Sequence, residues 1–281
     1  MKNKKWIGMF LILVVYAWAT LCGIVLYYAL PFTPWLSLLV ADVAATAVTF
    51  IFSLLLKNAS VYDPYWSVQP MVIGLCFALT KPLNGARILM LVAVFYWGVR
   101  LTTNWAYTFK NLNHQDWRYT MLKEKTGKFY PLVNFLGIHL FPTLVVYACV
   151  LPMVFTFLID YEMNVFSMLF FALSIVATTL QLVTDLDMQK FRKAGNRGFI
   201  RTGLWKYSRH PNYLGEILMW WGVALFFITA VPSMWYLAAG AIINTLMFLF
   251  VSIPMADKRQ SEKAGFREYK TQTRMLLPIK K

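Results

Sequence analysis

The sequence predicts an all-α protein, a polytopic bundle of about eight transmembrane helices. Of its 281 residues, 59% are hydrophobic and only 14% are charged, whereas a soluble domain usually has about 25% charged residues. The hydrophobic residues gather in eight runs, most of them near the roughly 20 residues that a helix needs to cross a bilayer. Lysine and arginine collect in alternate connections between these runs, as expected for segments that stay on one side of a membrane.

The expected spans follow one another along the chain, and the third is short enough to be tilted or partly buried. Their approximate bounds are 6–30, 35–56, 66–80, 88–108, 132–158, 164–184, 212–231 and 233–253. The first span is too long for the apolar part of a cleaved signal peptide, so we expect a retained signal anchor. We divide the chain into N-terminal transmembrane helices, residues 1–57, and a membrane domain, residues 58–281.

The distribution of positive charge predicts the orientation of the bundle. With the N-terminus inside, segments 1–5, 57–65, 100–131, 185–211 and 254–281 are cytoplasmic and hold 25 of the 27 Lys and Arg residues. This asymmetry predicts an integral membrane protein with both termini in the cytoplasm. The net charge of +15 therefore favours anionic lipid head groups and a phosphorylated cofactor as partners, rather than nucleic acid.

The most polar stretch of the chain, residues 181–216, lies between two apolar runs. On a helix, Gln181, Asp185 and Arg192 fall within about 40° of one another. A basic, glycine-containing loop follows, and Pro211 then suits the first turn of a new helix. Asn212 and Glu216 lie four residues apart on that helix and share a face. Two polar helix faces joined by a basic loop predict a site for a phosphate-bearing cofactor whose reactive end points toward the membrane.

Basic loops between transmembrane helices are common whatever the function, so the charge of this stretch has a simple alternative explanation. That explanation does not account for Asp185, Asn212 and Glu216, which fall at or inside the hydrocarbon boundary. Ionisable groups at that depth are costly and are functional candidates by default.

Other polar residues in apolar surroundings have two readings each. Asp63 precedes Pro64 and can cap a helix, or place a carboxylate at the mouth of a cavity. Tyr96, Arg100 and Asn104 share one helix face, although Arg100 can also extend to the interface. Asp42 is unexplained, and a lone histidine such as His139 is more often hydrogen-bonded between helices than a ligand. Lys258 and Glu262 lie on a tail helix that binds lipid or covers a cofactor.

Several motifs are absent from the sequence. It contains no GxGxxG after a strand, no P-loop, no HExxH, no CxxC and no GxSxG. The three cysteines, Cys22, Cys76 and Cys149, are isolated in apolar runs, and we expect no metal site. Any nucleotide is therefore expected to bind between transmembrane helices.

Four segments carry a resemblance to a known family: DPYWS at 63–67, RLTTNW with HQDWRY within 100–119, SRHPNYLGE at 208–216, and the tail SIPMADKRQSE with REYKTQTRMLLP. Together these segments resemble the steroid 5-alpha reductase family, in its bacterial branch of uncharacterised membrane proteins, over roughly residues 60–280. Sterol reductases and isoprenylcysteine methyltransferases carry similar RHPxY segments. The resemblance implies a helical membrane fold whose C-terminal half holds NADPH, and reduction of a carbon–carbon double bond conjugated to a carbonyl.

Position by position, the resemblance implies roles for individual residues. Asp63 matches a substrate-side glutamate, and the catalytic tyrosine falls at Tyr96 or at the adjacent Trp97. Either Arg197 or Arg201 is expected on phosphate. The predicted catalytic residues are Asp63 and Tyr96, and the predicted cofactor-binding residues are Arg100, Asn104, Gln181, Asp185, Arg192, Arg197, Arg201, Arg209, His210, Asn212, Tyr213, Glu216, Lys258 and Glu262.

The leading hypothesis is an NADPH-dependent reductase of a lipophilic, steroid-like or isoprenoid enone, in which Asp63 and Tyr96 hydrogen-bond the carbonyl oxygen. One alternative is an S-adenosylmethionine-dependent methyltransferase, although the basic loop favours a phosphate-rich ligand over a cationic sulfonium. Another is a non-catalytic lipid-binding or transport protein, which would tolerate Arg192→Lys where a bidentate phosphate site would not.

Overall fold

The computed structural model describes residues 4–196 and 198–281, and the regular elements of this part of the chain are helices. The longer ones are α1 (Lys5–Ala29), α2 (Pro34–Leu56), α3 (Tyr65–Thr80), α4 (Gly85–Thr108), α7 (Phe141–Leu158), α8 (Val165–Lys193) and α9 (Pro211–Ile228). The shorter ones are α5 (Trp117–Thr126), α6 (Tyr130–Val133), α10 (Ala239–Met247), α11 (Ile253–Gln260) and α12 (Phe266–Gln272). Two π-helical segments, Asn134–Leu140 and Phe248–Ser252, join α6 to α7 and α10 to α11.

The prediction of an all-α transmembrane bundle is confirmed. Within the described residues, six helices are long and apolar enough to cross a membrane: Lys5–Ala29, Pro34–Leu56, Gly85–Thr108, Trp117–Leu158, Val165–Lys193 and Pro232–Gln260. The other two predicted spans form α3, with 16 residues, and α9, with 18 residues, which are not among these six. The count of eight spans therefore stays a prediction.

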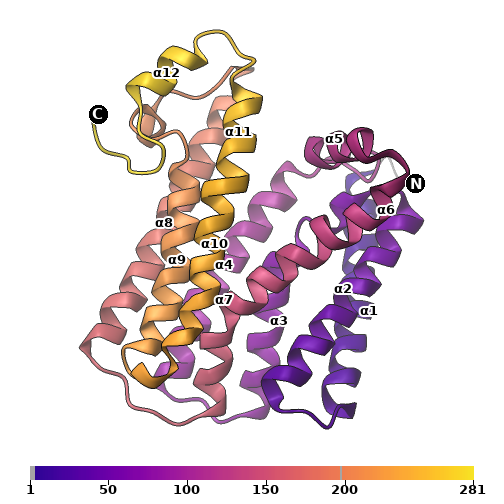
Figure 1. Cartoon of the computed structure of the whole chain (residues 1–281), viewed down its shortest axis with the longest axis vertical. Coiled ribbons are helices and arrows are strands. Elements are labelled where there is room, and N and C mark those ends of the chain that lie inside the picture. The colour runs from indigo at the N-terminus through magenta and orange to yellow at the C-terminus, as the bar shows by residue number, and fades with distance from the viewer. Residues whose placement is uncertain (1–3, 197) are drawn as a thin grey trace.

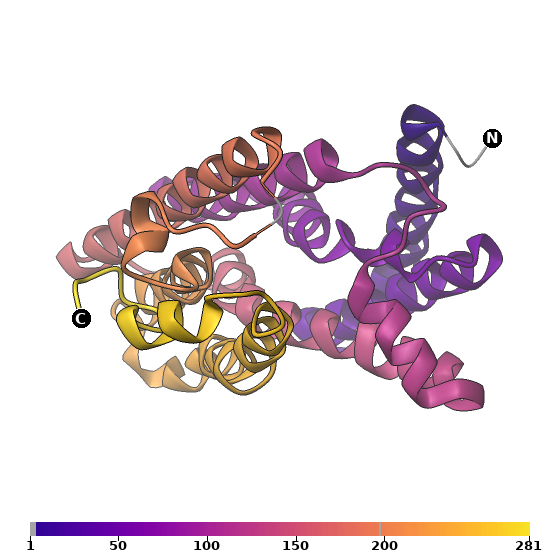
Figure 2. The ribbon, with the colours of Figure 1, turned by 90° about the horizontal axis from the view of Figure 1, so that it is seen from above.

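The helices form two groups that are joined by the long, inclined α7 (Figure 1). One group contains α1, α2 and α3, and the other contains α8, α9, α10 and α11, as the view from above also shows (Figure 2). The described start of the chain and its C-terminus lie at the same end of the bundle, beside α5 and α12 (Figure 1). This arrangement is the one that the predicted topology requires, whichever side of the membrane this end faces.

Two glycines let α8 and α9 approach each other closely. A Cβ atom on Gly215 would lie 2.7 Å from the carbonyl oxygen of Ala177, and one on Gly222 would lie 2.8 Å from that of Phe170. Small residues seven apart on one helix face allow this kind of close contact between membrane helices. The contact makes α8 and α9 a closely packed pair.

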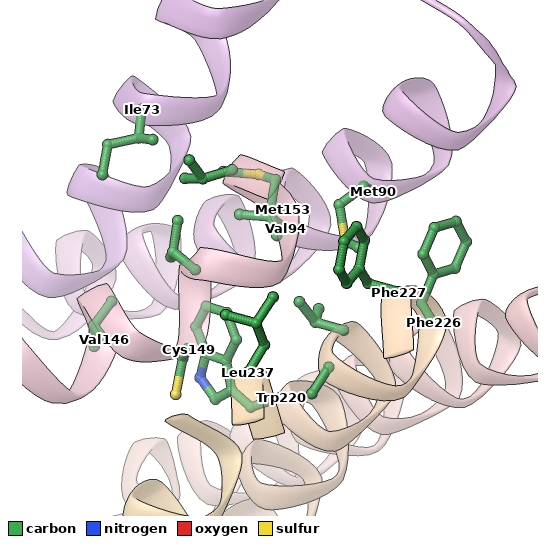
Figure 3. Close-up of a cluster of buried hydrophobic side chains, with 14 of the residues drawn as sticks. Ile73, Met90, Val94, Val146, Cys149, Met153, Trp220, Phe226, Phe227 and Leu237 are labelled. Atoms are coloured by element: carbon green, nitrogen blue, oxygen red, sulfur yellow. The ribbon is translucent and has the colours of Figure 1, made fainter. Parts of the chain in front are cut away.

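The hydrophobic core lies between α3, α4, α7, α9 and α10. Trp220, Phe227, Met90 and Met153 are almost fully buried there and interdigitate with Val94 (Figure 3). The outer helices instead expose large apolar side chains, among them Trp6 (76% exposed), Leu79 (78%) and Phe250 (73%). A buried core combined with an apolar outer surface is the pattern of an integral membrane protein.

Candidate functional site

A polar cavity of about 400 Å³ opens between the ends of α4 and α8, the start of α9, and the helices α11 and α12. Its size is within the range of small-molecule sites, about 300–1,000 Å³. The structure brings seven of the predicted cofactor-binding residues into its walls: Asn104, Asp185, Arg192, Arg209, His210, Asn212 and Tyr213. These residues come from three helices and one loop, so the polar cavity is a property of the fold rather than of one motif.

Helix geometry explains how α8 reaches this cavity. Asp185, Met188, Gln189 and Arg192 lie one turn or two turns apart and line one wall. Gln189 donates a hydrogen bond to Asn104 of α4 over 2.8 Å, which holds the two helix ends together. Arg192 is exposed, and no carboxylate of the described residues forms an ion pair with it. Its guanidinium is therefore free to bind an anionic ligand.

Behind the polar cavity, buried side chains form a charged network, here called the Arg100 network. Arg100 of α4 pairs with Asp185 at 2.9 Å and with Glu216 of α9 at 3.5 Å, and it donates a hydrogen bond to Gln181. Arg100, Gln181 and Glu216 are buried, with 7%, 1% and 4% exposed surface. One cation thus compensates two carboxylates from different helices, and Asp185 belongs to both the network and the cavity wall.

Two tryptophans complete the surroundings of Glu216. The indole nitrogen of Trp97 donates to both carboxylate oxygens, at 3.0 and 2.8 Å, and that of Trp220 donates to Oε1 at 3.0 Å. Burying a carboxylate is costly unless its oxygens accept hydrogen bonds, and here both are satisfied. Trp97 is thus a hydrogen-bond donor to Glu216, at the position where the resemblance implies a catalytic tyrosine.

Unpaired polar atoms around the cavity show what a ligand would have to supply. Among the described residues, the buried side-chain oxygens of Asn212 and Gln260 have no hydrogen-bond partner, and neither does Nε of Arg209. All three residues line the cavity, together with the basic side chain of Lys263. Buried polar atoms are usually paired, so this set fits a ligand that carries both anionic groups and hydrogen-bond donors.

The C-terminal segment covers the loop that precedes α9. Asp257 of α11 accepts a hydrogen bond from His210 at 2.9 Å and pairs with Arg209 at 3.4 Å and Lys270 at 3.1 Å. The hydroxyl of Tyr269 donates to the carbonyl oxygens of Trp205, at 2.5 Å, and Ser208. These contacts fix His210 and Arg209 in the cavity wall and define the entrance to α9.

Other predicted cofactor contacts lie elsewhere. Lys258 and Glu262 are exposed and are not part of the cavity lining, where Gln260 and Lys263 are found instead. The exposed Arg201 stacks on the ring of Phe199 at 4.5 Å and donates to the carbonyl of Gly265. Arg197 lies outside the described residues.

The two predicted catalytic residues do not form a pair. The hydroxyl of Tyr96 hydrogen-bonds Thr179 of α8 at 3.1 Å. Asp63, which lies just before α3, instead accepts a 2.6 Å hydrogen bond from the hydroxyl of Tyr119 on α5. Neither Asp63 nor Tyr96 is among the residues that line the polar cavity, and Tyr96 instead faces α8.

The surroundings of the Asp63 carboxyl favour its neutral, protonated form. Burial raises its pKa from the usual 3.8 to about 6, against the opposing effects of the Tyr119 hydrogen bond and the Arg118 charge. Because the folded-state pKa lies above the unfolded value, the associated stability is fully present below about pH 3.8 and is lost as the pH rises through about 6.

We expect the substitution Asp63→Asn to abolish the loss of stability that accompanies the rise of pH through about 6. The shift corresponds to at most about 3 kcal/mol, and less for a half-buried side chain. Thermal unfolding of both proteins at about pH 4 and about pH 8 measures the effect, and the variant should gain relative to the natural protein only at the higher pH. The same stability difference between the two proteins at both pH values would show that Asp63 does not change its protonation state between about pH 4 and about pH 8.

Sequence reasoning missed several residues of the site. Gln189, Gln260, Lys263 and Tyr269 line the cavity without having been expected there. The spacing of Ala256 and Gln260, four residues apart, was the signal that could have indicated one helix face, whereas Lys263 lies in the turn after α11. Tyr119 lies in the HQDWRY segment, but nothing local connects it with Asp63, 56 residues away.

Comparison with known proteins shows the family to which the chain belongs. A family model described as a protein of unknown function, DUF1295, matches residues 49–273. An uncharacterised protein of Schizosaccharomyces pombe is 27% identical over 246 residues, which cover 76% of this chain and 69% of the yeast protein. No solved structure matches the chain significantly.

The family match includes α3 to α12 and thus both the polar cavity and the Arg100 network. We conclude that the chain is a helical membrane protein of the DUF1295 family, which is related to the steroid 5-alpha reductases.

Proposed function

We propose that this protein is a membrane-embedded, NADPH-dependent reductase of a conjugated carbon–carbon double bond in a lipophilic enone. One observation carries the proposal. The polar cavity has an exposed, unpaired basic group at Arg192, and two turns away on the same wall Asp185 connects it to the buried Arg100 network. The charge distribution of a nicotinamide dinucleotide complements this arrangement, because it has anionic phosphates in one part and a neutral, carboxamide-bearing ring in another.

The donor set fits such a ligand. Arg192, Arg209 and Lys263 are the basic groups that would hold phosphates, and arginine is well suited to bidentate phosphate contacts. The unpaired oxygen of Asn212 would accept from the carboxamide of the nicotinamide. When bound, NADPH supplies the hydride. The protein's own residues bind and orient the cofactor, exclude water and position a proton.

Asp63 is the proposed acid. A carboxyl can hydrogen-bond a carbonyl oxygen as a donor only when it is protonated, and the pKa of Asp63 is raised to about 6. Tyr119, at 2.6 Å, would stabilise its charged form after the proton has left. Tyr96 remains a second proposed donor, with its hydroxyl 3.1 Å from that of Thr179. The lipid-facing surface suits a steroid-like or isoprenoid substrate, and we place the protein in the bacterial inner membrane with both termini in the cytoplasm.

The proposal is tested by incubating the purified protein in lipid nanodiscs with NADPH and a panel of steroidal and prenyl enones. We expect oxidation of NADPH that depends on the enone, with a saturated product confirmed by mass spectrometry. Asp63→Asn should lower turnover by about 10²-fold or more, with a smaller effect on NADPH affinity. Oxidation that is independent of the enone, or methyl transfer from S-adenosylmethionine in the same preparation, would contradict the proposal.

A further inference from the structure

A second cavity of about 450 Å³ lies between α1, α2 and α3. It shares no lining residue with the polar cavity. Helix α3 separates it from α4, since Ser67 and Met71 pack against Gly98 while Gln69, Val72 and Cys76 line this cavity. We call it the apolar cavity, because aliphatic and aromatic side chains form most of its wall.

Asp42, Gln69 and Tyr65 form a buried polar cluster at the apolar cavity, and the proposed reductase activity does not use it. Asp42 of α2 is 5% exposed and Gln69 of α3 is 7% exposed. The amide nitrogen of Gln69 donates to Asp42 at 2.7 Å, and the hydroxyl of Tyr65 donates to it at 3.3 Å. No basic side chain of the described residues forms an ion pair with Asp42. The carboxyl is therefore only partly compensated.

One acceptor atom of this polar cluster has no hydrogen-bond partner within the described part of the chain. The side-chain oxygen of Gln69 is buried and has no hydrogen-bond partner among the described residues. It is an acceptor, and the two donors beside it, the amide nitrogen of Gln69 and the hydroxyl of Tyr65, are already engaged with Asp42, so no donor of the cluster is left for this oxygen. An unpaired buried acceptor is costly, and a ligand that brings a donor would remove this cost.

The other end of the apolar cavity opens toward lipid. Leu79 and Tyr28 line it and are 78% and 68% exposed, and Lys81 marks the end of α3 beside them. Gln69 lies 12 residues before Lys81, which corresponds to about 18 Å along a helix. A long apolar body can therefore enter from the bilayer and place one polar end at Asp42.

We propose that the apolar cavity binds a membrane amphiphile whose apolar body fills the space between α1, α2 and α3 and whose hydrogen-bond-donating end, a hydroxyl or an ammonium, meets Asp42 and Gln69. The site is distinct from the polar cavity of the proposed reductase, because the two cavities share no lining residue. The family model begins at residue 49, so α1 and Asp42 lie outside its match.

The chain contains its own reporter for this site. Cys76 lines the apolar cavity, whereas Cys22, on α1, does not, and both thiols are partly exposed. Ligand in the cavity should slow alkylation of Cys76 by N-ethylmaleimide and leave the alkylation of Cys22 unchanged. Mass spectrometry of the protein in phosphatidylcholine nanodiscs measures both rates in one sample, and the reaction requires no catalytic activity.

Three added probes of equal chain length test the chemistry: stearyl alcohol, stearylamine and the methyl ether of stearyl alcohol. We expect the alcohol, the amine or both to protect Cys76. The ether should need an about tenfold higher concentration for the same protection, because it has no hydrogen-bond donor. Protection by the alcohol alone identifies a neutral hydroxyl ligand, and protection by the amine alone identifies an ammonium ligand. In Asp42→Asn the advantage of the protecting probe over the ether should shrink about tenfold.

The proposal is overturned if the ether protects as well as the other probes, if Cys22 is protected equally, or if no probe protects. The comparison of probes needs only the natural protein, so it remains decisive even where Asp42→Asn does not fold. Because NADPH is not involved, a failure here would leave the reductase proposal standing, and a failure of that proposal would leave this one standing.

Discussion

Replacing Arg100 with methionine is expected to lower the free energy of unfolding by about 3–5 kcal/mol. Arg100 lies between Asp185 and Glu216, and both carboxylates are mostly buried, with side-chain exposures of 12% and 5%. Methionine keeps much of the apolar stem but leaves two carboxylates without their shared cation. Thermal unfolding in detergent, together with titration by a denaturing detergent, measures the loss.

Arg87 is the matched control, because it is a second buried arginine on the same helix, with 6% exposed surface. Its ion-pair partner Asp160 has a side chain that is 91% exposed and can be hydrated when the arginine is removed. It also donates to the carbonyl oxygens of Thr156 and Pro82 and lies over the ring of Phe157. Arg87→Met should therefore cost clearly less, about 1–2 kcal/mol. Equal losses in the two variants would mean that the Arg100 network is not charged as described.

The substitution Arg192→Lys is expected to weaken NADPH binding by about tenfold or more, although the charge is conserved. A guanidinium binds phosphate through two parallel hydrogen bonds, which a lysine ammonium cannot reproduce. Arg192 is the exposed arginine of the cavity wall. The fluorescence of bound NADPH, titrated against the purified protein, gives the dissociation constant.

Arg201→Lys is the control for this measurement. Arg201 is also exposed and also belongs to the basic loop region, but it stacks on Phe199 and is not part of the cavity lining. We expect its substitution to change the dissociation constant by less than about twofold. If the two lysine variants behave alike, the loop acts through general positive charge, and the lipid-binding alternative gains support.

The sequence predicted the helices and one wall of the site because both depend on local periodicity. Apolar runs near the thickness of a bilayer formed helices in every case. Asp185 and Arg192 share a face through the geometry of a single helix, and both line the polar cavity. Gln181 belongs to the same stripe but lies one turn deeper, where it meets Arg100.

The rest of the site depends on contacts and helix phases that are not visible locally. The π-helical segment Phe248–Ser252 precedes α11, and such a segment changes the helical phase of the residues that follow. Gln260, at the end of α11, and Lys263, in the turn after it, line the cavity in place of Lys258 and Glu262. Asp63 and Tyr119 are 56 positions apart and their pairing depends on the fold of the chain between them, so sequence spacing could not distinguish Tyr119 from Tyr96.

Binding of NADPH in the polar cavity is the central claim, and a thermal-shift titration with NADPH, NADH and S-adenosylmethionine tests it most directly. NADPH at about 100 times its dissociation constant should raise the free energy of unfolding by about 2.7 kcal/mol, because it binds only the folded state. Most of this gain should disappear in Asn212→Ala, whose side-chain oxygen is unpaired in the cavity wall. No stabilisation by NADPH, the same stabilisation in Asn212→Ala, or stabilisation by S-adenosylmethionine instead would contradict the claim.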